Sequence, residues 1–253
     1  MKYMSLLICA ALLIAGCSDS PNSPGGTLPV VQNCRIDTGN CKGDTITVAW
    51  DPVNVEVDGY RVWYADTNPG DWEIVAQVEG TSTQHIATRT GYYCVDAIKA
   101  LDSSEDQSNK ANDRAEMYLV DDTMYVYGNS GIQFFETHTA LGDASQESFA
   151  QDLYIEWAGD TILFYSGNHD PENYPGGTAS MIAAANNYLA PGPGDAAWKN
   201  SAAAIEGQSY FVMLENGYYA IFSVDTVFDN WVVINSSQYQ PIFGVRLFNP
   251  FIY

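Results

Sequence analysis

Thr45-Ile46-Thr47-Val48-Ala49-Trp50-Asp51-Pro52 is the stretch of this sequence that decides its fold. Apolar and polar residues alternate along it, so that Ile46, Val48 and Trp50 share one face of an extended chain. A period of two is typical of a strand with one buried face, and the pair Asp51-Pro52 ends the run. The stretch therefore predicts a β-strand over residues 45–50.

Further short strands follow this one. Apolar runs predict strands at residues 60–64, 72–78, 84–87 and 92–101. Turn residues separate them at Asp58-Gly59, Asn68-Pro69-Gly70 and Glu79-Gly80. Because short strands with turns every 8–12 residues or so are typical of two packed antiparallel sheets, we expect a β-sandwich here.

Three quoted segments carry a family resemblance. Residues 45–52 are followed by Gly59-Tyr60-Arg61-Val62-Trp63-Tyr64, and then by Ala100-Leu101-Asp102-Ser103 with Glu105 and Ser108. Together they resemble a fibronectin type III domain over residues 28–111. The resemblance implies that Trp50 is the core tryptophan of the second strand, and that the module is a spacer or binding unit without enzymatic activity.

The sequence departs from this family at one position. If Ala100 is the family's alanine, Cys94 stands where the family usually has its core tyrosine, next to Tyr92 and Tyr93. Asp96 would then also point into the core. A bulge or a shift of one residue in this strand would remove both conflicts.

Residues 112–253 continue the β pattern after a polar boundary at residues 109–113. Strand pairs are predicted at 117–120 with 124–127, at 152–157 with 162–165, and at 210–214 with 219–224. Asp121-Asp122 and Gly159-Asp160 would turn the first two pairs. Asn216-Gly217 turns the third, and Asn-Gly is the strongest short hairpin signal. Residues 231–234 and 243–248 predict further strands, so we expect a second β-rich domain, a sandwich or jelly-roll-like.

One segment of this domain differs from the rest. Residues 168–177 read as a loop, and residues 178–189 predict a short helix with Met181, Ala185 and Tyr188 on one side and Pro191 beyond its end. The expected fold class is therefore all-β, a fibronectin type III-like sandwich followed by a β-rich domain with a short helical insertion. A long irregular insertion often carries function.

The N-terminus reads as an export signal. Lys2 precedes an apolar run at residues 6–13, which is too short to span a bilayer, where about 20 apolar residues are needed. Ile14-Ala15-Gly16-Cys17 resembles the lipobox of bacterial lipoproteins. The resemblance implies removal of residues 1–16 and lipid on the sulfur of Cys17; the alternative is an ordinary signal peptide with a chance cysteine.

The segment after the lipobox is expected to be a lipidated tether over residues 17–27. It is polar, with two prolines and two glycines, and so cannot bury a core. Ser18 resembles the lipoproteins that are sent on to the outer membrane. We therefore expect a protein of the bacterial cell envelope, anchored to the membrane through Cys17.

Charge and cysteine content restrict the possible partners. The chain has 31 acidic and 10 basic residues, a formal net charge of -21, and should be repelled by nucleic acid. Export to an oxidising compartment favours a Cys34–Cys41 disulfide across a turn sequence, with Cys94 left as a buried thiol. A zinc site from these three cysteines and His85 has suitable ligands but lacks close-paired spacing.

No catalytic motif is recognisable. Asp152 and Glu156 share a strand face about 13 Å apart, too far for the carboxylate pair of a glycosidase, so they are expected on a solvated face. Tyr154, which lies between them, and the loop at residues 169–174 suggest a polar and aromatic ligand-binding surface, whose candidate residues are Tyr154, Glu156, His169 and Tyr174. The alternative is that these are ordinary exposed strand and loop residues. No cofactor is expected, although Asp170, Glu172 and Asp195 have the oxygen ligands that calcium takes.

Three functions remain open. The first is a non-enzymatic, lipid-anchored protein whose β modules bind a protein or a glycan. The second is an enzyme or accessory protein of polysaccharide degradation, and the third is a purely structural envelope protein. The missing catalytic motifs favour the first and the third.

Overall fold

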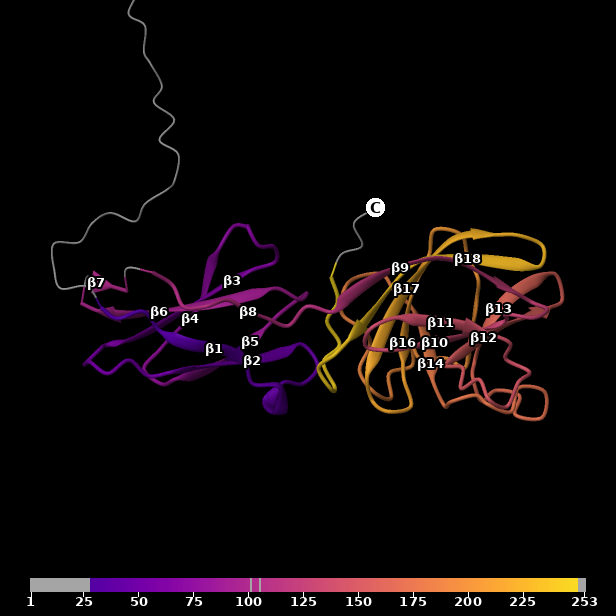
Figure 1. Cartoon of the computed structure of the whole chain (residues 1–253), viewed down its shortest axis with the longest axis horizontal. Coiled ribbons are helices and arrows are strands. Elements are labelled where there is room, and N and C mark those ends of the chain that lie inside the picture. The colour runs from indigo at the N-terminus through magenta and orange to yellow at the C-terminus, as the bar shows by residue number, and fades with distance from the viewer. Residues whose placement is uncertain (1–27, 101, 105, 250–253) are drawn as a thin grey trace, which may run out of the picture.

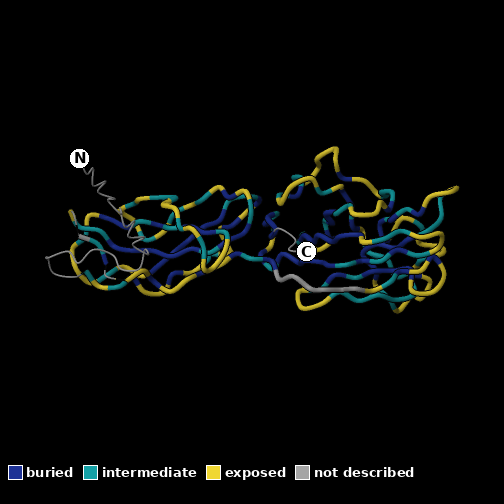
Figure 2. The backbone as a smooth tube through the Cα atoms, turned by 90° about the horizontal axis from the view of Figure 1, so that it is seen from above, coloured by how far each residue is buried: buried dark blue, intermediate teal, exposed yellow. Residues whose placement is uncertain are grey.

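The computed structural model describes residues 28–100, 102–104 and 106–249, with backbone only for Asp102 and residues 116–121. The predicted signal peptide, Cys17 and the tether lie outside these residues, as do Leu101 and Glu105 of the family resemblance. Two β domains lie end to end (Figure 1). Figure 2 shows buried backbone along the middle of both domains and exposed loops around it.

The N-terminal domain is a sandwich of two antiparallel sheets. One sheet has the order β1-β2-β5 and the other β4-β3-β6-β7, with β8 also pairing with β6. This is the fibronectin type III-like sandwich that the sequence predicted, and Trp50 and Val62 lie buried between its sheets. Its strands are β1 (Gln32–Ile36), β2 (Thr45–Asp51), β3 (Gly59–Ala65), β4 (Glu73–Val78), β5 (Ser82–Ile86), β6 (Tyr92–Lys99), β7 (Asp102–Ser103) and β8 (Ala111–Asn112), and a 3-10 turn, η1 (Thr38–Asn40), links β1 to β2.

Strand β6 is shifted by one residue relative to the family pattern. Tyr93, and not Cys94, occupies the core, together with Val95. Asp96 therefore lies on the opposite face of the sheet, where it is paired with Arg61 and accepts a hydrogen bond from Trp63 Nε1 at 2.6 Å. The shift removes the conflict that the sequence raised.

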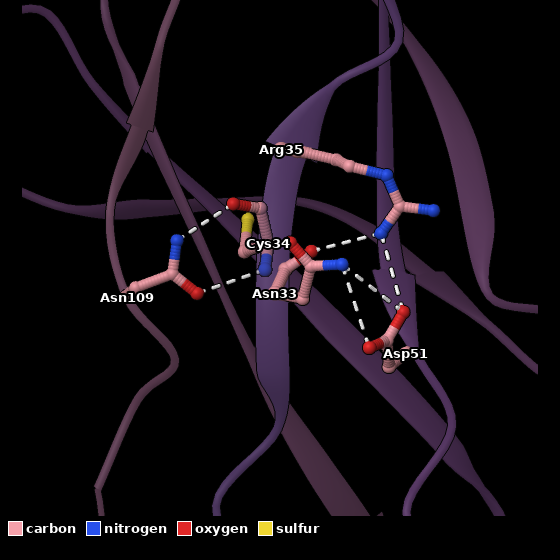
Figure 3. Close-up of polar contacts among 5 residues, drawn as sticks. All are labelled: Asn33, Cys34, Arg35, Asp51 and Asn109. Atoms are coloured by element: carbon pink, nitrogen blue, oxygen red, sulfur yellow. Dashed lines mark hydrogen bonds and ion pairs between the residues drawn. The ribbon is translucent and has the colours of Figure 1, made fainter.

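The predicted Cys34–Cys41 disulfide is not formed in this structure, where both residues are free, buried thiols. The side-chain amide of Asn109 holds the backbone of Cys34, accepting from its N–H at 2.9 Å and donating to its carbonyl at 2.7 Å (Figure 3). The two sulfurs meet different groups: Cys34 Sγ lies 3.8 Å from the Tyr93 carbonyl, and Cys41 Sγ lies 3.3 Å from the Asp37 carbonyl. Burial raises the pKa of both thiols, which lowers their reactivity.

The C-terminal domain is a second antiparallel sandwich. Its two sheets have the orders β14-β16-β17-β18-β9 and β11-β10-β12-β13-β15. Phe164, Tyr210 and Phe222 pack together in the core between them. Its strands are β9 (Glu116–Tyr125), β10 (Gly131–Phe134), β11 (Thr139–Gly142), β12 (Leu153–Ala158), β13 (Thr161–Ser166), β14 (Met181–Ala184), β15 (Ser201–Ala203), β16 (Ser209–Met213), β17 (Tyr219–Val227) and β18 (Trp231–Gln240).

The helix predicted at residues 178–189 is wrong, and the segment contains strand β14. Its residues pair with β16, with Ile182 opposite Val212, and Ile182 and Ala183 are both buried. The alanines favour a helix locally, but the open edge of β16 offers a full set of backbone hydrogen bonds. Tertiary pairing therefore overrides local propensity here.

Two further predictions for this domain are also wrong, a turn and a strand. Residues 116–125 form one continuous strand, β9, without a turn at Asp121-Asp122, because β18 pairs with it along its length and only its register shifts there. Residues 243–248 do not form a strand and make only isolated bridges, Gly43 with Val245 and Leu189 with Leu247.

Residues 241–249, which we call the strap, join the two domains. The strap lies between the N-terminal domain and the rest of the C-terminal domain, where the yellow end of the chain runs in Figure 1. Gly43 N–H donates to the Gly244 carbonyl and Arg246 N–H to the Gly43 carbonyl, both at 2.8 Å. Ile242, Val245 and Leu247 are buried in the core of the N-terminal domain. The first domain is thus completed by residues from the other end of the chain.

Two fully buried glutamines of β18 fix the strap. Gln240 Nε2 donates to the Leu247 carbonyl at 2.7 Å, and its Oε1 accepts from Ile242 N–H at 3.1 Å. Gln238 bonds both backbone groups of Asn249, at 3.0 Å each. These side chains satisfy strap backbone groups that lie away from water, where unpaired groups are costly.

Leu247→Ala should destabilise the N-terminal domain although Leu247 lies outside it in sequence. Removing a buried leucine side chain costs about 2–5 kcal/mol. The measurement is urea unfolding of residues 18–253, followed by tryptophan fluorescence. Ile86→Ala is the control, since Ile86 is 72% exposed on the same domain. Equal unfolding midpoints for the two variants would contradict the role assigned to the strap.

Candidate functional site

Four stacked rings lie on the outer face of the β12–β13 pair. Tyr154 and Tyr165 are directly opposite each other in this pair, on the face away from the core residues Leu153 and Ile155. Their rings stack at 5.5 Å, and the loop that follows β13 adds one ring at each end: Tyr174 stacks on Tyr154 at 4.0 Å, and His169 on Tyr165 at 4.6 Å. We call these four residues the ring stack.

The loop over the ring stack is held by a buried carboxylate. Asp152 accepts hydrogen bonds from Phe134 N–H and Thr178 Oγ1, both at 2.8 Å, and from Ser180 Oγ at 3.3 Å. The expectation that Asp152 lies on a solvated face is therefore wrong, because the 167–180 segment covers it. Burial is the main cause that raises its pKa, and Glu215 adds to it. With its oxygens occupied by three donors, Asp152 serves as an anchor for the loop.

A close backbone contact also closes the loop. A Cβ on Gly177 would stand 1.7 Å from the Gly167 carbonyl oxygen, so only glycine fits there.

Asp170 accepts hydrogen bonds from the backbone N–H of Asn173 at 3.2 Å and from its side-chain amide at 2.8 Å, and these bonds lower the pKa of Asp170. This proposed calcium ligand is thus engaged within the loop, and the described part of the chain holds no cluster of three or more residues suited to a metal ion.

The predicted ligand-binding residues are brought together, but in unequal roles. Tyr154 is fully buried and supports the outer rings, whereas His169 is exposed and Tyr174 half-buried. Burial raises the pKa of Tyr154, Tyr165 and Tyr174, and the carboxylate of Glu156 raises each of them further. Their hydroxyls therefore stay protonated at neutral pH.

A second group of aromatic rings lies mainly on the β9–β18 pair of the other sheet and was missed by the sequence reasoning. Trp231 stands opposite Tyr125 across β18 and β9, and it stacks on Phe228 at 3.7 Å. Tyr127, two residues beyond Tyr125, is 81% exposed, and its proximity contributes to the raised pKa of Tyr174. We call Tyr125, Tyr127, Phe228 and Trp231 the distal patch.

The distal patch lies at one end of the molecule. The β17–β18 turn that carries Phe228 is at the right-hand end in Figure 1, whereas Leu28 bridges Ser104 beside β7 at the left-hand end. A signal for it was present in the sequence: aromatic residues flank polar turns at residues 128–130 and 229–230, where burial is not expected.

A groove opens between the two domains, with a volume of about 670 Å³. The turn at residues 42–44 forms one side, and the β16–β17 hairpin and the strap form the other. This volume is in the range of small-molecule sites, about 300–1,000 Å³. Within the part of the chain that the structure describes, no helix has the length and apolar character needed to cross a membrane.

Neither a family model nor a curated protein matches this sequence. Among solved structures, a fibronectin type III-like protein from Clostridium thermocellum is 16% identical over 34% of this chain and 92% of its own, with a TM-score of 0.29. A DUF4466 family protein from Parabacteroides merdae is 11% identical, covers 84% of this chain and 100% of its own, and has a TM-score of 0.38. A two-domain fibronectin type III segment of chicken tenascin is 11% identical, covers 81% of this chain and 98% of its own, and has a TM-score of 0.28. These likenesses are too distant to carry an argument about ligand or activity.

Tyr154→Phe should leave the free energy of unfolding unchanged or raise it by up to about 1 kcal/mol, because the buried Tyr154 hydroxyl has no partner among the described residues. Tyr210→Phe is the matched comparison. Its buried ring is similar, but its hydroxyl donates to the Ala203 carbonyl at 2.6 Å and accepts from Ile205 N–H at 3.1 Å, so the loss should be about 1–2 kcal/mol. Chemical denaturation compares the two, and a larger loss for Tyr154→Phe would refute this assignment.

Proposed function

We propose that this protein is a lipid-anchored, non-enzymatic component of the bacterial cell envelope that presents its C-terminal domain to a glycan. The observation that carries the proposal is the distal patch, a set of exposed rings at the end of the molecule opposite residue 28. A tether that attaches Cys17 to the outer membrane would hold the other end. The strap would keep the two domains in line, so that the patch stands away from the membrane.

The chemistry of the patch supports a glycan as its ligand. Flat aromatic rings bury the apolar C–H face of a sugar, while carboxylates and amides accept hydrogen bonds from its hydroxyls. The exposed side chains of Asp225, Asp229 and Asn230 supply such acceptors beside Phe228 and Trp231. Nucleic acid is disfavoured as a partner, because the chain has a formal net charge of -21.

We expect residues 18–253 to bind one class of glycan on an array. The double variant Tyr127→Ala/Phe228→Ala should bind that glycan about tenfold or more weakly, because exposed aromatic anchors dominate such contacts. The whole 18–253 chain is needed because the strap residues would be exposed in an isolated C-terminal domain. Ile205→Ala is the control, being an exposed apolar residue of the same domain. Binding to no glycan would refute the glycan proposal, and binding unaffected by the double variant would refute the role of the patch.

The anchor is tested separately. In a bacterium with lipoprotein processing, the full-length chain should fractionate with the membrane, and mass spectrometry should find diacylglycerol on Cys17. Replacing residues 1–17 by an ordinary cleavable signal peptide should instead release the protein into the soluble fraction, because the acyl chains supply the membrane affinity. Membrane association that survives this replacement would contradict lipid anchoring and would leave the ligand proposal unaffected.

A further inference from the structure

The groove between the domains carries two cationic side chains in a strongly acidic protein. Lys42 comes from the turn before β2, and Arg246 comes from the strap. Among the residues whose side chains the structure describes, neither has a carboxylate within 4.0 Å, although the chain has 31 acidic residues for 10 basic ones. Two cations without an ion-pair partner, one from each domain, thus line the same groove.

The guanidinium of Arg246 is held in place. Its Nη1 donates to the Ala190 carbonyl at 2.6 Å, and a Cβ on Gly43 would stand 3.1 Å from its Nη2. A guanidinium has five N–H donors in a fixed plane and binds carboxylates in a bidentate manner. Only one of these donors is used within the described residues, so the group is oriented in advance for a carboxylate ligand.

An aromatic ring of the strap also lines the groove, on the side opposite the turn at residues 42–44. Phe243 is 61% exposed, and its ring packs against Gly217 and meets the edge of Tyr218 at 5.5 Å. Tyr219 and Met213 continue this apolar side. The groove therefore combines a flat apolar surface with a fixed positive charge.

We propose that this groove binds a sugar that carries a carboxylate, such as a uronic acid unit of an acidic polysaccharide. The sugar carboxylate would pair with Arg246 and Lys42, and the C–H face of the ring would pack on Phe243. Asp44 and Glu215 also line the groove, and their negative charges disfavour a densely charged polyanion. Glu215 accepts a hydrogen bond from Ala179 N–H at 3.3 Å. The inference rests on the proposed glycan-binding function but uses a site separate from the distal patch.

The test is calorimetric titration of residues 18–253 with a trisaccharide that carries one uronic acid unit and with its neutral methyl ester. We expect the acid to bind about tenfold or more tightly than the ester, with an affinity that falls as salt is raised. Lys42→Gln and Arg246→Gln should each weaken the acid about tenfold and leave the ester unchanged. Arg35→Gln is the control, because Arg35 is exposed and paired with Asp51 outside the groove.

Three outcomes would overturn the inference. The first is equal affinity of the protein for the acid and the ester. The second is an unchanged affinity of Lys42→Gln for the acid. The third is a short acidic peptide that binds as tightly as the acid sugar, which would assign the groove to a protein partner. Lys42 is exposed, so its variant remains informative even if Arg246→Gln disturbs the strap. If the distal-patch variant loses its glycan binding but Lys42→Gln binds the acid as tightly as the unaltered protein, this inference fails while the proposed function stands.

Discussion

The side-chain amides of Gln238 and Gln240 are the interaction on which the joined structure depends. Both are fully buried, and together they bond four backbone groups of the strap, at Ile242, Leu247 and Asn249. Each of those groups, if left unpaired, would cost about 1–3 kcal/mol. Because an amide offers both a donor and an acceptor, these two residues substitute for a strand partner that the strap lacks. An irregular segment can therefore be buried between two sandwiches.

This constraint also determines where the surfaces of the molecule lie. The groove has walls from both domains, so it keeps its shape only while the strap holds Gly43 against Gly244 and Arg246. The ring stack and the distal patch depend on different supports, the β12–β13 pair and the β9–β18 pair. The groove at the junction and the distal patch at the free end are thus held by separate parts of the structure.

The features that the sequence predicted correctly are those that local patterns specify. Alternation around Trp50 and the Asn216-Gly217 turn predicted strands and a hairpin, because side-chain periodicity and turn geometry act over a few residues. The helix at residues 178–189 and the strand at residues 243–248 were wrong, because distant partners decide those segments. Within the site, Tyr154 and Tyr174 were found through a strand and its neighbouring loop, whereas the burial of Asp152 depends on how that loop folds back.

The strap has a consequence for how the chain is made. A chain that emerges N-terminus first usually folds its first domain before the next one appears. Here the core around Trp50 and Val62 needs Ile242, Val245 and Leu247, which follow the whole second domain. The core of the first module can therefore be completed only after the second has been synthesised. A chain cut short before the strap would leave the core of its first domain open to water.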